Sequence, residues 1–162
     1  MDFSQTYLYK LRKLTTTLDR VFDQTLRAHT HLSLSQFTFL LALNTFGQTS
    51  QQKIASFLDI STPAVSRQAD IASENGWIKR TTSLTDRHGY SLQLTPQGKR
   101  VMQHGLNTLE THVFKIFTNE QQQTDLMGHI DMLLNNIKTV AREQTTLQPQ
   151  KKTMMERNFY DI

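Results

Sequence analysis

The sequence contains no cysteine, which excludes disulfide bonds, thiolate metal sites and cysteine-based redox sensing. It also has no apolar run close to the roughly 18–20 residues that a bilayer span requires. The first residues, MDFSQTYLYKLRK, lack the apolar stretch of a signal peptide, so we expect a cytoplasmic protein without a membrane partner. With 162 residues, 37% of them hydrophobic and 20% charged, the chain is long enough to bury a core and fits one domain.

The residue patterns of enzymes and metalloproteins are also missing. No nucleophile–base pair stands in a recognisable motif, no glycine-rich loop is suited to cradling phosphate, and the carboxylates are scattered. His104 and His112 are eight residues apart on one predicted helix, and at about 1.5 Å per residue they are too distant to share an ion. His29 and His31 flank a helix end, where a histidine from another helix could meet them. We therefore predict no catalytic residue, no metal site and no cofactor.

A modest positive charge of +4 is present, and it is unevenly placed. Residues 50–100 hold seven Lys/Arg and four Asp/Glu, a net +3, whereas residues 101–162 hold six and seven, a net −1. A basic middle third favours a polyanionic partner, and nucleic acid is the first to test. A solvated basic face explains the same charges, so the charge alone does not decide between the two.

Two segments predict helices with an apolar stripe of their own. Along residues 3–28 apolar side chains recur every three, four or seven positions, and the stripe is longer than a small domain needs for its own core. In the last clear helix the spacing is four, three, four, three, which is typical of a helix-packing seam. The stripe residues are Phe3, Tyr7, Leu11, Leu14, Leu18, Val21 and Ala28 in the first, and Leu126, Ile130, Leu133, Ile137 and Val140 in the second.

Cap and turn signals divide residues 33–76 into three shorter helices. A capping box at Ser33-Leu34-Ser35-Gln36 predicts the first start. A short apolar segment at residues 54–58 predicts the second helix. The third opens at Ser61-Thr62-Pro63, with Thr62 expected as the cap and Pro63 at the first helical position. Four apolar residues are expected in the core that these helices share: Ile54, Leu58, Ile60 and Val65.

Residues 77–95 change from helical to strand-like periodicity. Two apolar runs, around residues 77–82 and 90–94, flank a polar loop at 83–89, which predicts a hairpin with a projecting loop. A short helix, a turn, a second helix and a hairpin form a winged helix-turn-helix. The predicted fold class is therefore mainly α with a small two-stranded β-wing, in which long terminal helices accompany the winged helix-turn-helix core.

The second helix of this motif has the polarity of a DNA-reading helix. Its inner face is predicted to hold Val65, Ala69 and Ala72. Its outer face holds Pro63, Arg67, Asp70 and Glu74, with Ser66 beside them, so its acidic residues lie toward the far end. A recognition helix meets DNA with its N-terminal turns, where Ser and Thr contact phosphates or bases and Arg pairs with guanine or phosphate.

Several short motifs stand in order between about Leu34 and Arg100. The most specific is Asp86-Arg87-His88-Gly89 followed by Leu92-Gln93-Leu94-Thr95-Pro96-Gln97-Gly98. The others are Leu34-Ser35-Gln36-Phe37, Ile54-Ala55, Pro63-Ala64-Val65-Ser66-Arg67 and Glu74-Asn75-Gly76-Trp77-Ile78. With these motifs the stretch resembles MarR-type transcriptional regulators. The resemblance implies that double-stranded DNA is contacted by Ser61, Thr62, Pro63, Ser66, Arg67, Arg87 and His88. It also implies a homodimer and a small effector, bound between dimer body and winged helix, that weakens DNA binding.

The loop of the wing departs from the family pattern, which usually reads Asp-x-Arg. Counted back from Leu94, the arginine position is occupied by His88, and Arg87 stands one residue earlier. Arg87 has a permanent charge, whereas free histidine is mostly neutral at neutral pH. Gly89 relaxes the backbone, so we predict that a one-residue shift turns Arg87 into the minor groove and leaves His88 beside the phosphates. A second departure is that Gln68, Ala69 and Ala72 stand where the family often has larger apolar residues.

We therefore predict a single domain over residues 1–143, followed by a tail, 144–162, to which we assign no firm structure. The winged helix-turn-helix spans residues 33–99, and residues 3–28 and 100–143 supply dimerisation helices. The predicted function is sequence-specific regulation of transcription, with repression implied by the resemblance, through a pseudo-palindromic operator. The alternative is a winged-helix module that binds proteins and never contacts DNA.

Overall fold

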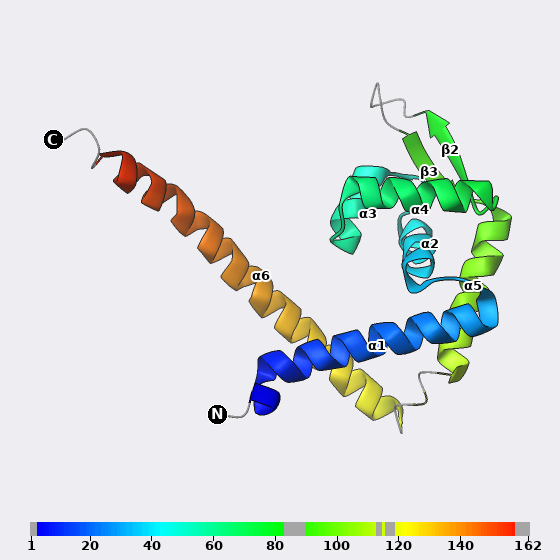
Figure 1. Ribbon diagram of the computed structural model, residues 1–162, viewed down its shortest axis with the longest axis horizontal. Helices are drawn as coiled ribbons and strands as arrows, with labels where there is room; N and C mark the ends of the chain where they lie inside the picture. The colour runs from blue at the N-terminus through cyan, green and yellow to red at the C-terminus, as the bar shows by residue number, and fades with distance from the viewer. Residues whose placement is uncertain (1–2, 83–89, 113–114, 116–118, 158–162) are drawn as a thin grey trace. The chain divides into compact units, whose positions relative to one another are not determined.

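The computed structural model describes residues 3–82, 90–112, 115 and 119–157, and it divides into two compact units, Met1–Lys115 and Ile116–Ile162. In chain order the first unit contains η1 (Phe3–Gln5), α1 (Tyr7–Thr30), α2 (Leu34–Phe46), β1 (Thr49–Ser50), α3 (Gln51–Leu58), α4 (Thr62–Glu74), β2 (Ile78–Thr82), β3 (Tyr90–Leu94) and α5 (Pro96–His112) (Figure 1). The second unit contains α6 (Glu120–Arg157), which continues past residue 143. No helix in the described ranges is both long and apolar enough to cross a membrane.

The element order confirms the predicted winged helix-turn-helix. Helices α3 and α4 contact each other and both contact α2, while β2 and β3 form the antiparallel hairpin of the wing. Ile78 pairs with Leu94 and Thr82 with Tyr90. The sheet has a third strand that we did not predict, because β1 pairs Thr49 with Leu92 on the free side of β3.

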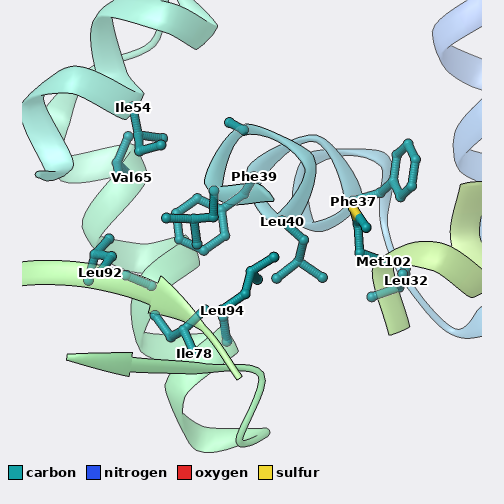
Figure 2. Close-up of a cluster of buried hydrophobic side chains, with 14 of the residues drawn as sticks. Leu32, Phe37, Phe39, Leu40, Ile54, Val65, Ile78, Leu92, Leu94 and Met102 are labelled. Atoms are coloured by element: carbon teal, nitrogen blue, oxygen red, sulfur yellow. The ribbon is translucent and has the colours of Figure 1, made fainter. Parts of the chain in front are cut away.

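The core of the first unit is built around α2. Phe39 and Leu40 point toward the strand residues Leu92 and Leu94, and all four are buried (Figure 2). The predicted inner face of α4 is confirmed, since Val65, Ala69 and Ala72 are at most 2% exposed. Ala69 and Ala72, which are small where the family often has larger residues, thus lie in the core. Helix α4 is therefore held by its buried face, which leaves the opposite face exposed.

Local caps set the helix boundaries. The predicted capping box is confirmed: Ser33 Oγ accepts from Gln36 N at 3.2 Å, and Gln36 Oε1 accepts from Ser33 N at 2.8 Å. The predicted cap of α4 is wrong by one residue, because Ser61 Oγ accepts from Ala64 N and Thr62 is already helical. Ile60 is also not a core residue, being 40% exposed. It follows Asp59, whose left-handed backbone (φ 53°) ends α3 and redirects the chain.

Asp23 connects α1 to the beginning of α2. Its Oδ2 accepts from Arg27 Nε at 2.6 Å, and its Oδ1 accepts from the backbone N–H of Leu34 at 2.8 Å. The hydrogen bond from Arg27, then the one from Leu34, hold the pKa of the Asp23 carboxyl below its usual value of 3.8. Leu34 is the first residue of α2, so the carboxylate satisfies a backbone donor that a helix start leaves free.

We expect Asp23 to stabilise the protein in a pH-dependent way. A depressed folded-state pKa contributes stability above the unfolded pKa, about 3.9, and this contribution is lost as the pH falls through the folded value. Asp23→Asn should therefore lower the urea midpoint at pH 7 and lose less stability than the wild type on acidification to about pH 3. Asp19→Asn, one turn earlier on α1, is the matched control. An equal acid-induced loss in Asp23→Asn and wild type would contradict this coupling.

Candidate nucleic-acid interface

The N-terminal turn of α4 is exposed. Ser61, Thr62 and Pro63 are all exposed, Ser61 Oγ accepts from the N–H of Ala64, and the Ser61 carbonyl oxygen accepts from the N–H groups of Ala64 and Val65. The N-terminus of a helix carries partial positive charge and unpaired N–H groups, which favour anions such as phosphate. Pro63, near the start of the helix, has no N–H to leave unsatisfied. This end of α4 is thus suited to meet the DNA backbone.

Next to this turn the surface has an open hollow of about 580 Å³. Four predicted contact residues line it together: Thr62, Pro63, Ser66 and Arg67. Gln51, the first residue of α3, lines it as well, and we did not predict it. Ser50 Oγ caps α3 by accepting from Lys53 N, and the position of Gln51 beside α4 depends on the turn between the two helices.

Arg67 is the exposed cation of this surface. It forms no ion pair with any residue in the described ranges, and it lies on the exposed face of α4 two turns before Glu74. No described residue occupies its guanidinium, whose donors can bind phosphate oxygens or the O6 and N7 acceptors of guanine. This availability makes Arg67 the strongest candidate for a DNA contact on α4.

Polar contacts fix α4 against its neighbours on two sides. Gln68 is half-buried, and its Nε2 donates to Ser35 Oγ of α2 at 3.4 Å. Asp70 accepts from Arg80 of β2. The helix is thus attached to α2 on one side and to the wing on the other, so that its N-terminal turn is presented by a rigid base.

The base of the wing is also fixed, at the junction with α5. Thr95 Oγ1 donates to the carbonyl oxygen of Gly76 at 2.7 Å and accepts from Gly98 N at 3.0 Å. Thr95 N donates to the Trp77 carbonyl at 2.9 Å. The tip of the wing, including the predicted contacts Arg87 and His88, lies outside the described residues.

Two histidines meet between α1 and α5. His29 of α1 stacks on His112 of α5, with ring centroids 4.3 Å apart and planes 10° apart. Across the described part of the chain, no three His, Cys, Asp or Glu side chains gather in a way that could hold a metal ion. The stacked pair therefore joins α1 to α5 as a packing contact.

Comparison with known proteins agrees with this geometry. Residues 32–89 match the model of the MarR family. The uncharacterized HTH-type transcriptional regulator YpoP of Bacillus subtilis (strain 168) is 30% identical over 86 residues, which cover 53% of this chain and 61% of YpoP. The match thus spans about three fifths of that relative.

Solved structures share the fold over most of the chain. The transcriptional repressor CouR, bound to a 23-mer DNA duplex, matches with a TM-score of 0.66 and 27% identity, covering 86% of this chain and 95% of CouR. BpsR of Bordetella bronchiseptica, whose DNA binding is regulated by 6-hydroxynicotinic acid, matches with a TM-score of 0.71 and 19% identity. The match to BpsR covers 82% of this chain and 96% of BpsR.

Proposed function

Because residues 32–89 match the model of the MarR family, we propose that this chain is a MarR-type transcriptional regulator that binds a specific DNA sequence as a homodimer. One observation carries the proposal: the N-terminal turns of α4 present Thr62, Ser66 and Arg67, which has no ion pair among the described residues, together around an open hollow. Each of these groups can bind a phosphate or a base edge.

In this proposal α4 enters the major groove with its N-terminal end first. Ser61 and Thr62 contact the backbone, and Arg67 reaches a guanine or a phosphate. The loop of the wing lies over the flanking minor groove. There we retain the sequence-based proposal that Arg87 is inserted and His88 stays beside the phosphates.

The dimer is proposed from apolar surface that each unit leaves uncovered. On α1, Tyr7 is 88% exposed, and Leu11 and Leu14 are about half exposed. On α6, the seam residues Leu126, Ile130, Leu133, Ile137 and Val140 are all at least 40% exposed. Long apolar stripes of this kind are typical of subunit interfaces. Two-fold symmetry then implies a pseudo-palindromic operator with half-sites about one helical turn apart.

Deleting residues 1–22 should abolish the dimer. The deletion removes most of the α1 stripe, so the apolar surface that it covers in the partner subunit becomes exposed. We expect monomer or aggregate in sedimentation experiments. A truncated protein that sediments as a stable dimer and binds DNA normally would place the interface elsewhere.

We use the relatives to propose whether this chain represses or activates transcription and whether a small ligand controls it. CouR is a repressor, and the DNA binding of BpsR is regulated by a small aromatic acid. We propose that this chain also represses transcription and that a small ligand releases it. Such a ligand acts only if it binds more tightly to a dimer conformation with one spacing of the two recognition helices than to a conformation with another spacing.

Capture of genomic DNA tests the proposal against its alternative. Wild-type protein is incubated with sheared genomic fragments, and the retained fragments are sequenced. A DNA reader enriches fragments that share a pseudo-palindrome. A winged-helix module that only binds proteins enriches no sequence, and that result would reject the proposed function.

A further inference from the structure

The exposed face of α4 carries an acidic residue next to the arginine that we place against DNA. Asp70 follows Arg67 by three positions, so the two side chains lie about one turn apart on one face. The side chain of Asp70 is 54% exposed. Together with Glu74, this face has one positive and two negative charges. An uncompensated carboxylate here would repel the phosphates that approach Arg67.

Arg80 of β2 neutralises this carboxylate. Its Nη2 donates to Asp70 Oδ1 at 2.5 Å, and its side chain is only 27% exposed. Its Nε is buried and has no hydrogen-bond partner among the described residues. Burial of a guanidinium with an unpaired donor is unfavourable by itself. The contact with Asp70 is therefore what holds Arg80 in this position, against α4 and away from open solvent.

We propose that Arg80 is a positioning residue for DNA binding, which cancels the charge of Asp70 beside Arg67 and ties the wing to the recognition helix. In this role Arg80 acts through Asp70 and does not itself contact the phosphates. The inference rests on the proposed function, since the charge of Asp70 matters to binding only if α4 meets DNA. It assigns a DNA-binding role to two residues outside the expected contact set.

Neutral substitutions of Asp70 and Arg80 separate the two roles that Arg80 could have, which are cancelling the charge of Asp70 and contacting a phosphate directly. The wild type is compared with Arg80→Gln, Asp70→Asn and the double variant Asp70→Asn/Arg80→Gln on a captured operator fragment at several salt concentrations. Arg80→Gln uncovers the carboxylate and should weaken binding on the order of tenfold. The double variant removes both charges, so it should bind within about threefold of the wild type. Its salt dependence should match the wild type, because no phosphate contact is lost.

Two results would overturn the inference. If the double variant binds as weakly as Arg80→Gln and its salt slope falls by about one, Arg80 contacts a phosphate directly. If Arg80→Gln binds like the wild type, the charge of Asp70 is irrelevant to DNA. Thermal unfolding of all four proteins checks that they fold. If Arg80→Gln does not fold, the affinity and the salt slope of the double variant still show whether Arg80 contacts a phosphate. A wild type that binds no DNA would instead reject the proposed function, and this inference with it.

Discussion

Replacing Gly98 with alanine is expected to destabilise the protein by about 3 kcal/mol or more, at the upper end of what overpacking costs. Gly98 is buried in the first turn of α5, and a Cβ there would lie 2.0 Å from the Trp77 carbonyl oxygen and 2.8 Å from its carbon. These atoms belong to the backbone, which cannot rotate away as a side chain can. The same carbonyl accepts from Thr95 N and from Thr95 Oγ1, so moving it breaks the junction that fixes the wing.

Urea unfolding of Gly98→Ala beside two matched glycine variants measures this effect. The atoms nearest to a Cβ at Gly105 belong to side chains, Phe37 at 2.7 Å and Leu26 at 3.4 Å, so we expect a smaller loss for Gly105→Ala because side chains can shift. Gly128→Ala in α6 has no neighbour within 4 Å and should be neutral or slightly stabilising. A Gly98→Ala midpoint equal to that of Gly128→Ala would show that α5 and Trp77 are not in close contact.

Replacing Arg67 with alanine is expected to weaken operator binding by about 1–3 kcal/mol, which is roughly five- to 150-fold. Arg67 has no ion pair among the described residues, so its removal leaves no buried partner and should not change the unfolding midpoint. The loss therefore reports on DNA contact alone. It is measured by titration of the captured operator and of a scrambled duplex.

Two matched variants identify what Arg67 contacts. Arg67→Lys keeps the charge but loses the bidentate hydrogen-bonding geometry of the guanidinium. The variant should retain DNA binding if Arg67 contacts phosphate, and it should lose binding if Arg67 reads guanine. Glu74→Ala, on the same exposed face near the far end of α4, controls for general damage to the helix. Unchanged affinity of Arg67→Ala for both duplexes would mean that α4 is not docked by its N-terminal turns.

Features with a short-range cause could be predicted from the sequence. The capping box at Ser33 and Gln36 is formed by residues three positions apart, so four letters are sufficient to identify it. The buried face of α4 follows from the helical spacing of Val65, Ala69 and Ala72. The same periodicity places Arg67 on the exposed face, which explains why the central part of the candidate site could be predicted.

Features that depend on distant contacts could not be predicted. Strand β1 has two residues and exists only because Thr49 meets Leu92, so it shows no alternation of its own. Gln51 joins the site only because the turn after α3 brings the two helices together. The pairing of Asp70 with Arg80 likewise joins a helix to a strand, and nothing in the spacing of these residues indicates it.

The salt dependence of operator binding tests whether α4 and the wing bind DNA through phosphate contacts and base readout. Affinities of the wild-type protein for a captured operator and for a scrambled duplex are measured between about 50 and 200 mM salt. We predict a loss on the order of a hundredfold or more for the operator over this range, with the operator bound more tightly than the scrambled duplex at every salt concentration. Binding that is insensitive to salt would contradict phosphate contacts by α4 and the wing, and equal binding of the two duplexes would contradict base readout.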